Sequence, residues 1–204
     1  MICRFPHRKI NPLVVDLQFI LNELISGDDA RAEAVVPGLA QMGAAALDPL
    51  LAMLDSPGSD QRWWATRALA ALVQPEARDG LRRSLKDRDP AVRQCAALGL
   101  RQRPTQSAIS ALIDALHDPD RLFARLAADA LVAIGPVTIS SLISVMESPD
   151  PAARIEAIRA LAAIEDPQAI HPLYVALDDP SQMVGYWAEQ GLNRLGVGMV
   201  YFKP

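Results

Sequence analysis

An all-α fold is predicted for this chain of 204 residues, as an α-α superhelix (solenoid) of about six helix pairs. Three observations carry the prediction. An apolar anchor recurs every 30–31 residues, small residues and a leucine follow each anchor at fixed distances, and a turn rich in aspartate and proline lies in between. The anchors are Leu24, Leu54, Leu85, Leu116, Met146 and Leu177. Such a period is typical of stacked helical units that share one continuous core.

The small residues define the second helix of each unit, helix B. We number positions from the anchor, so that position 11 lies eleven residues after it. Position 11 holds Val35, Ala65, Ala96, Ala127, Ala157 and Ala188. Position 14 holds Gly38, Ala68, Gly99, Ala130, Ala160 and Gly191, and position 15 is leucine in all six units. These positions share one face of a helix, which we expect to press against its neighbours.

The turns supply a start signal for each helix B. They contain Asp55-Ser-Pro-Gly58, Asp89-Pro90, Asp118-Pro119, Ser148-Pro-Asp-Pro151 and Asp178-Asp-Pro180. Asp and Ser are good helix N-caps, and proline is tolerated in the first turn of a helix. The residues before each anchor also have a helical pattern, as in 108–116 and 169–177. Each unit is therefore predicted as helix A, turn, helix B.

We expect one repeat domain over residues 1–204, with an N-terminal extension (1–12), the repeats (13–196) and a C-terminal capping tail (197–204). Pro37 is predicted to kink the first helix B or delay its start. The third unit is the least regular, because Arg103 stands where other units have a hydrophobic residue. The apolar tail is expected to fold back over the last unit.

Composition narrows the function classes. Hydrophobic residues make up 50% and aromatic residues 5% of the chain, and the net charge is −4. No basic footprint of a nucleic-acid-binding protein is present. Two cysteines make no disulfide framework, no secretion signal is recognisable, and no apolar run approaches the roughly 20 residues of a membrane span. We expect a cytoplasmic protein with no nucleic-acid or membrane partner.

The repeat also predicts a functional face. If positions 7, 11, 14, 15 and 18 face the core, then positions 9, 12, 13, 16 and 17 of helix B face outward, onto what is normally the concave surface of such superhelices. The candidate groove residues are Trp63, Thr66, Arg67, Gln94, Arg101, Arg125, Asp129, Arg159, Tyr186, Glu189 and Gln190. With Arg194 and Glu33 added, this face has five arginines against three acids, so it is predicted to attract an anionic ligand or an acidic partner. The alternative is that these arginines only solvate the face or pair with carboxylates of the next unit.

Two further sets of residues follow from the same numbering. Arg62, Arg93 and Arg154 share position 8 near the turn aspartates, which predicts a structural ladder between units. Two aromatic pairs, Trp63-Trp64 and Tyr186-Trp187, recur at positions 9 and 10. We expect the position 9 residue of each pair to point into the groove as an anchor, and the position 10 residue to lie in the core or be partly buried.

Catalytic motifs are not found. The chain has three isolated histidines, no His-Glu pair, no zinc-ligand spacing, no glycine-rich phosphate loop and no G-x-S-x-G motif. Cys95 lies beside the small-residue stripe and is predicted to be an inert packed thiol. Cys3 is expected on an exposed arm. No metal or required cofactor is predicted.

The helix A pattern Ala-x-x-Pro-Leu-x-x-x-Leu, the Asp-Pro turn and the period resemble the HEAT-like repeats of the phycobilin lyase family, over Leu13 to Gly196. The ending from Tyr186-Trp187 to Pro204 resembles that of the phycoerythrin-linked branch, and the size is similar to that of E/F-type members. The resemblance of the repeats identifies the fold more than the function, and the resemblance of the C-terminal ending is more specific.

The resemblance implies a protein that binds a phycobilin, a linear tetrapyrrole, and a phycobiliprotein subunit, with a second HEAT-like lyase subunit as a further partner. It would assist thioether formation at a cysteine of the partner, as a lyase subunit or a chaperone. Stacking on Trp63 and Tyr186, arginines at the propionates and Asp129 at the pyrrole nitrogens would fit such a ligand. No catalytic residue is assigned.

Two other functions stay open at this point. A non-enzymatic HEAT scaffold would use the same face for a protein partner. HEAT-like DNA glycosylases also combine aromatics with a positive groove, but the net acidity of this chain argues against that class.

Overall fold

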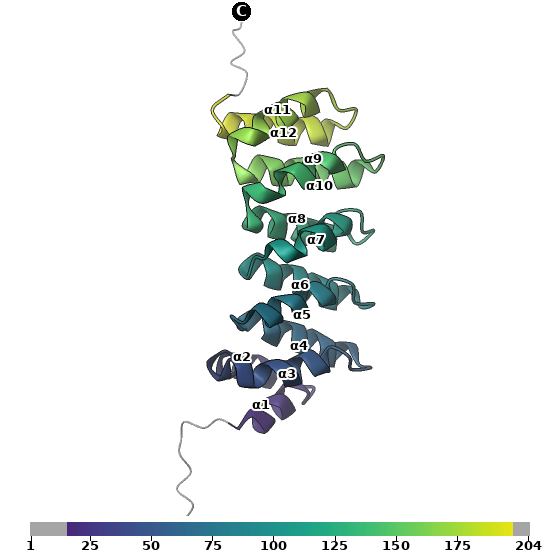
Figure 1. Ribbon diagram of the computed structural model, residues 1–204. Helices are drawn as coiled ribbons and strands as arrows, with labels where there is room; N and C mark the ends of the chain where they lie inside the picture. Colours follow the sequence, from purple (N-terminus) through teal and green to yellow (C-terminus); the bar gives the residue numbers. More distant parts are fainter. Residues whose placement is uncertain (1–15, 198–204) are drawn as a thin grey trace, which may run out of the picture.

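The computed structural model describes residues 16–197, and it contains six pairs of α-helices stacked along one axis (Figure 1). The first helices of the pairs are α1 (Leu17–Leu24), α3 (Ala44–Met53), α5 (Pro75–Ser84), α7 (Ile109–Ala115), α9 (Ile139–Val145) and α11 (Ile170–Val175). The second helices are α2 (Asp29–Met42), α4 (Ser59–Ala71), α6 (Pro90–Gln102), α8 (Arg121–Ile134), α10 (Pro151–Ile164) and α12 (Gln182–Arg194). The predicted solenoid of six helix pairs is confirmed.

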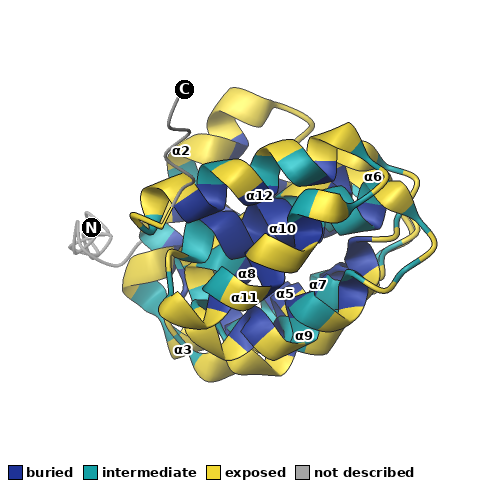
Figure 2. Cartoon of the chain, turned by 90° about the horizontal axis from the view of Figure 1, so that it is seen from above, coloured by how far each residue is buried: buried dark blue, intermediate teal, exposed yellow. Residues whose placement is uncertain are grey.

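The helices form two layers. Each second helix packs on the second helix of the next unit, from α2 on α4 to α10 on α12. The first helices form the other layer, and the view along the stack shows buried residues concentrated between the layers (Figure 2). Short 3₁₀ turns lead into α7, α9 and α11, at Gln106–Ala108, Pro136–Thr138 and Pro167–Ala169, and a fourth one, Ala176–Asp178, follows α11. We call the two layers the A face and the B face after their helices.

The small-residue stripe lies in the core as predicted. Position 15 is a leucine with an exposed fraction of at most 3% in every unit, and position 11 is buried in all units but the first. Position 14 marks the closest helix contacts. A Cβ added at Gly191 would lie 2.8 Å from the Cβ of Ala162, which leaves no room for a side chain between α12 and α10. Small residues are therefore required by the spacing of the B helices.

The turns start the second helices as expected. Asp28, Asp89, Asp120 and Asp150 accept backbone N–H donors through their side chains at the starts of α2, α6, α8 and α10. Pro90 and Pro151 occupy the first turn of their helices, where no N–H donor is needed. Gly58 and Ser181 occupy the equivalent position in the second and last units without a side-chain hydrogen bond.

The predicted ladder of position 8 arginines is present, and we call it the Arg–Asp ladder. Each arginine bonds to a backbone carbonyl of the turn before its own helix and to the position 2 aspartate of the next unit. The pairs are Arg62–Asp87 (2.7 Å), Arg93–Asp118 (3.6 Å) and Arg154–Asp179 (2.9 Å). Burial alone would raise the pKa of the Asp87 carboxyl, but hydrogen bonds from Arg62 and from the Asp89 N–H, together with the charges of Arg62 and Arg88, lower it. The ladder thus ties successive turns along one edge of the stack.

Two irregular residues have a structural explanation. Pro37 is exposed inside α2, and the helix runs from Asp29 through it to Met42, so the late start predicted for this helix is wrong. Arg103 reaches back to the C-terminal end of α4, where its guanidinium lies 3.4 Å from the carbonyl oxygens of Ala70 and Ala71. It satisfies carbonyls that have no partner within their own helix.

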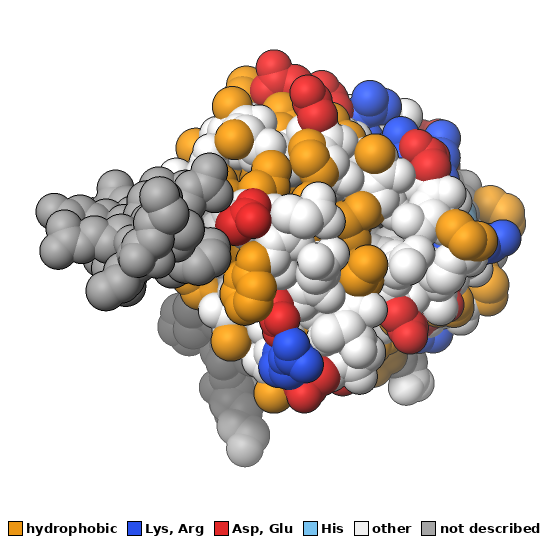
Figure 3. Space-filling view, turned by 90° about the horizontal axis from the view of Figure 1, so that it is seen from below, with side chains coloured by type: hydrophobic (Ala, Val, Ile, Leu, Met, Phe, Trp, Pro, Cys, Tyr) orange, Lys and Arg blue, Asp and Glu red, His pale blue; other side chains and the backbone are white. Residues whose placement is uncertain are grey.

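The two ends of the stack differ. At the α1 end, hydrophobic side chains are spread between polar ones, with most charged side chains near the margin (Figure 3). Phe19 and Ile25 of the first unit are about half exposed, at 54% and 50%. At the other end, Val197 is the last residue described; the expected tail beyond it and the extension with Cys3 lie outside the described residues. No helix between residues 16 and 197 is long and apolar enough to cross a membrane.

Candidate functional site

The outward stripe of the B face is narrower than predicted. Position 12 is buried in the first five units, by Val36, Thr66, Ala97, Ala128 and Ile158, and exposed only in the last unit, at Glu189. The prediction that Thr66 lines the groove is therefore wrong. Thr66 has no exposed surface, and its hydroxyl donates to the Arg62 carbonyl and contacts Ser84 Oγ. Position 12 faces the next unit, so it is exposed only where the stack ends.

Three of the predicted residues meet in one pocket. A hollow of about 370 Å³ lies between α4 and α6 on the B face, and Trp63, Arg67 and Gln94 line it. The remaining lining residues are Ala70, Ala91, Cys95, Leu98, Gly99 and Gln102. We call this the Trp63 pocket. The pocket is shallow because α4 and α6 touch at its base. A Cβ at Gly99 of α6 would lie only 3.0 Å from the Cβ of Ala70 of α4.

One wall of the Trp63 pocket is aromatic. The indole of Trp63 is half-buried and stands edge-on to that of Trp64, with ring centroids 4.7 Å apart and an angle of 87° between the planes. Trp64 is buried in the core, as its position predicts. This contact packs one side of Trp63 against the core and leaves part of its surface open to a flat ligand. Leu98, which is 41% exposed, supplies an apolar surface from α6.

The polar side chains of the pocket are already positioned by neighbours. Arg67 pairs with Glu33 of α2, and Gln94 Nε2 donates to Asp120 Oδ2 at 2.8 Å. Burial would raise the pKa of Asp120, but hydrogen bonds from Gln94 and from backbone N–H groups lower it. Arg67 retains one third of its side-chain surface, so an anion can reach it from the pocket.

Cys95 is the thiol at the base of the pocket. It is 7% exposed, and burial raises its pKa to about 12. The positive charge of Arg67 acts in the opposite direction but does not reverse the shift. The thiol is therefore protonated at neutral pH and is a poor nucleophile, which agrees with the packed, inert thiol predicted from the sequence.

A second cluster occupies the B face of α8 and α10. Arg159 Nη1 donates to Asp129 Oδ1 at 2.8 Å, its Nε donates to Glu156 Oε2 at 2.8 Å, and its Nη2 donates to the Arg125 carbonyl at 3.1 Å. Only 8% of Arg159 is exposed. We expected Arg159 to be open to a ligand, and that prediction is wrong, because its donors bind the protein.

The remaining arginines of this cluster are accessible. Arg101 of α6 lies 4.0 Å from Asp129 Oδ2 and keeps 57% of its side-chain surface exposed. Arg125 of α8 is exposed as well. Asp129 is half-buried and engaged by Arg159, so it is less available to ligand nitrogens than the sequence suggested. Arg101 and Arg125 extend the accessible positive surface from the Trp63 pocket toward α8.

Tyr186, Glu189 and Gln190 lie on α12, far along the stack from the Trp63 pocket (Figure 1). Tyr186 is 49% exposed and meets Trp187 edge-on at 5.3 Å and 74°. The two aromatic pairs therefore share a geometry, as their shared positions predict. The structure does not bring them together, since α12 packs on α10 and α11.

Sequence reasoning missed part of the pocket. Leu98 occupies position 13, the same outward position as Arg67. A leucine at an outward position indicates an apolar contact surface, and Leu98 is indeed exposed. Gln102 and Ala91 had no such signal. Among the described residues no cluster of histidine, cysteine or carboxylate side chains could hold a metal ion.

Comparisons with known proteins agree with this architecture. The family of HEAT repeats matches residues 47–132 and 139–197. The bilin biosynthesis protein RpcF of Synechococcus sp. (strain WH8020) is 34% identical over 85 residues, and the match spans 41% of this chain and 41% of RpcF. The match thus spans less than half of the length of RpcF. It confirms the resemblance noted in the sequence.

Solved structures show the same fold. The complex of CpcE and CpcF of phycocyanin lyase from Nostoc sp. PCC7120 contains a chain of TM-score 0.53 and 24% identity, matched over 96% of this chain and 82% of that one. The archaeal HEAT-like repeats protein from Thermococcus onnurineus NA1 has a TM-score of 0.62 at 13% identity, over 93% of this chain and 84% of that one.

Proposed function

The chain belongs to the HEAT-repeat family, and we propose that it is a phycobilin lyase-type protein whose B face binds a linear tetrapyrrole and a phycobiliprotein subunit. It assists attachment of the chromophore to a cysteine of that subunit in the cytoplasm, as a lyase subunit or a chaperone. The observation that carries the proposal is the Trp63 pocket, which combines an aromatic wall with an accessible guanidinium. The similarity to RpcF supports the choice of ligand class.

The chemistry of the pocket suits one end of a phycobilin. A conjugated pyrrole ring stacks on Trp63 and contacts Leu98. A propionate replaces Glu33 as the partner of Arg67. The pocket of about 370 Å³ is at the small end of the usual range for ligand sites, so the rest of the ligand lies along α6 toward Arg101 and Arg125. Asp129 then acts from its ion pair with Arg159 and not as a free carboxylate.

The role of the protein in the proposed reaction is orientation. The nucleophile belongs to the partner subunit, and this fits with Cys95, the cysteine beside the ligand, being protonated and buried. Holding a tetrapyrrole in one orientation against a partner cysteine converts an encounter of two molecules into a nearly intramolecular step. A second subunit, by analogy with the complex of CpcE and CpcF, would cover the side of the tetrapyrrole that the B face leaves open.

The experiment is a titration of a phycobilin with the purified protein, followed by its visible absorbance. We expect a shifted, sharpened long-wavelength band that saturates, and Trp63→Ala and Arg67→Glu are each expected to weaken binding by roughly tenfold. Tyr186→Ala at the far end of the stack is the matched control and is expected to have a much smaller effect. An unchanged spectrum, with and without a phycobiliprotein subunit, would reject the proposal.

A non-enzymatic scaffold is the second candidate. It is favoured by the ion pairs of Arg67 and Arg159, which are complete without any ligand. A scaffold would bind a phycobiliprotein or another subunit with no change in phycobilin absorbance. Co-sedimentation of the subunit in the absence of phycobilin, together with an unchanged phycobilin spectrum, would favour it.

A further inference from the structure

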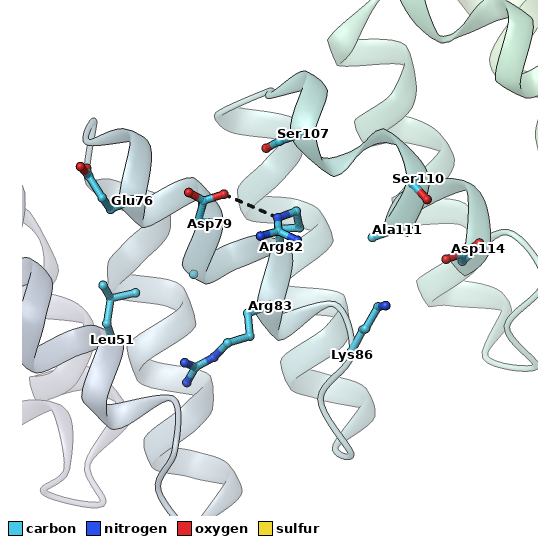
Figure 4. A pocket seen from close by; sticks show the side chains of 11 residues that line it. Leu51, Glu76, Asp79, Arg82, Arg83, Lys86, Ser107, Ser110, Ala111 and Asp114 are labelled. Carbon is cyan, nitrogen blue, oxygen red and sulfur yellow. Dashed lines mark ion pairs between the residues drawn. The ribbon is translucent and has the colours of Figure 1, made fainter.

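A second hollow lies on the A face, on the opposite layer from the Trp63 pocket. It has a volume of about 630 Å³ and runs between α5 and the η1–α7 segment (Gln106–Ala115), with Leu51 of α3 at its edge (Figure 4). The charged side chains that line it are Glu76, Asp79, Arg82, Arg83, Lys86 and Asp114. We call it the α5 groove.

The groove exists because the third unit breaks the repeat. Three residues before the anchor, other inner units place a half-buried hydrophobic residue on helix A, such as Leu51, Ile113 and Ile143. The third unit has Arg82 at this position, and its guanidinium stays exposed because burial of an unpaired charge is costly. The seam between α5 and α7 is therefore open where a hydrophobic side chain would fill it.

A glycine deepens the groove. A Cβ at Gly80 would lie 2.8 Å from Leu51 Cδ2 and 2.9 Å from Leu69 Cδ1, so Gly80 lets α5 sink close to α3 and α4. The wall on the α7 side is formed by Ser107, Ser110 and Ala111, which are small and offer two hydroxyls (Figure 4). Such walls can accept an extended backbone without steric conflict.

The charge of this region opposes that of the rest of the chain. Residues 75–103 contain eight of the 20 lysine and arginine residues but only four of the 24 acidic residues. Arg82, Arg83, Lys86 and Arg88 are all exposed at the C-terminal end of α5 and in the turn that follows. The lining of the groove itself has as many acids as cations, so the positive charge is confined to these four exposed side chains at the C-terminal end of α5 and in its turn.

The ion pairs in the groove are weak and exchangeable. Arg82 lies 3.5 Å from Asp79, and Arg83 lies 2.9 Å from Asp55, with 46–75% of these side chains exposed. Ion pairs this exposed stabilise a protein little, so a competing carboxylate can replace them. Lys86 has no ion pair within residues 16–197. A negatively charged partner thus gains contacts at little cost to the protein.

We propose that the α5 groove docks an extended, acidic segment of a partner protein. Carboxylates of the segment pair with Arg82, Arg83 and Lys86, and its backbone runs past the hydroxyls of Ser107 and Ser110. Glu76 and Asp79 in the N-terminal half of α5 and Asp114 of α7 repel acidic residues, so the acidic stretch lies over Arg82, Arg83 and Lys86 at the C-terminal end of α5. This surface is separate from the B face and leaves the Trp63 pocket free.

The test uses a fluorescein-labelled octapeptide of alternating glutamate and serine, with fluorescence anisotropy at low salt. Wild-type protein is expected to bind it, with an affinity that falls as salt rises. Arg82→Glu/Lys86→Glu is expected to weaken binding at least tenfold. The control, Arg121→Glu/Arg194→Glu, makes the same change of net charge at exposed arginines outside the groove and is expected to weaken binding less than twofold.

The outcomes are separable from those of the B face. Both double variants are expected to keep the wild-type helicity, measured by circular dichroism, and the phycobilin titration is expected to be unchanged in Arg82→Glu/Lys86→Glu. No binding of the glutamate peptide, equal binding of a lysine–serine peptide, or equal losses in both double variants would overturn the proposal. Equally tight binding of a single-stranded oligonucleotide of similar charge would also overturn it, because the surface would then select charge alone.

Discussion

Neighbouring units are joined in two different ways, and the difference shows where charge serves the fold. The Arg–Asp ladder joins the second unit to the third, the third to the fourth and the fifth to the sixth. At the two other junctions, position 8 is alanine and position 2 of the next unit is serine, as in Ala124 and Ser148. Arginine and aspartate are thus present together or replaced together.

The junctions without the ladder have an ion pair on the B face instead. Glu33 of the first unit pairs with Arg67 of the second, and Asp129 of the fourth unit pairs with Arg159 of the fifth. Every junction therefore has at least one ion pair, at the turn edge or on the B face, and the junction of the third and fourth units has both, because Arg101 also lies 4.0 Å from Asp129. Arg67 and Arg159, which the sequence predicted to bind a ligand, therefore also link neighbouring helices. The positive charge that is accessible to a ligand is smaller than the number of arginines implies.

Removing a ladder arginine is expected to have the largest effect. The side chains of Arg62 and Asp87 are 6% and 11% exposed, so Arg62→Ala leaves a nearly buried carboxylate without its partner. A loss of about 3 kcal/mol in the free energy of unfolding is expected, measured by urea denaturation. The double variant Arg62→Ala/Asp87→Ala is expected to regain part of this free energy, because it no longer contains the unpaired carboxylate. An equal loss in both variants would show that the pair itself is unimportant.

Removing the acid of the B-face pair comes next. Asp129→Ala is expected to lower the free energy of unfolding by about 1–2 kcal/mol, because Arg159 keeps its bonds to Glu156 and the Arg125 carbonyl but loses one partner. From the sequence alone we would expect nearly unchanged melting for this variant. Thermal unfolding distinguishes the two expectations, and exposed Glu189→Ala on α12 is the neutral control.

Transplanting the ladder tests whether the two kinds of junction are interchangeable. Ala124→Arg alone is expected to be destabilising, since it places a charge at a site with no exposed surface and with serine, not aspartate, at position 2 of the next unit. Adding Ser148→Asp is expected to restore about 1 kcal/mol relative to the sum of the single variants. A coupling energy near zero in this double-mutant cycle would mean that the turns of the fourth and fifth units are not in ladder register.

The smallest effect is a dependence on acid pH. The folded-state pKa values of Asp87 and Asp179 are lowered below 3.8, since hydrogen bonds from Arg62 and Arg154 outweigh the effect of burial. Their stabilisation is present above that ordinary value and is lost as the pH falls through the folded-state pKa. The melting temperature of the wild type is expected to fall more steeply between about pH 4.5 and 2.5 than that of Asp87→Asn/Asp179→Asn. Parallel curves would contradict this assignment.

Most of this fold can be predicted from the sequence, because the same pattern of residues occurs in six units and an irregular residue in one unit does not obscure it. Six leucines at position 15 and a small residue at position 14 identify the buried stripe, and the position 8 arginines identify the ladder. The width of the outward face could not be predicted in the same way. Thr66 at position 12 is polar but buried, because its hydroxyl bonds to the Arg62 carbonyl, a contact between turns of one helix that composition does not reveal.

The candidate site was less predictable for a related reason. Whether an arginine is free depends on the residue that faces it from a neighbouring unit, 28–34 positions away along the chain. Arg159 and Arg101 are both outward arginines by position, yet one is 8% exposed and the other has a half-exposed side chain. Only the stacking of α6, α8 and α10 around Asp129 decides between them.

The most direct test of the central claim is hydrogen–deuterium exchange of the protein with and without a saturating phycobilin, followed by mass spectrometry. Binding at the Trp63 pocket predicts slower exchange in peptides from α4 and α6, with no change in α5, α7 or α12. Protection confined to the A face, to α12, or to no part of residues 16–197 would contradict the assignment of phycobilin binding to the B face.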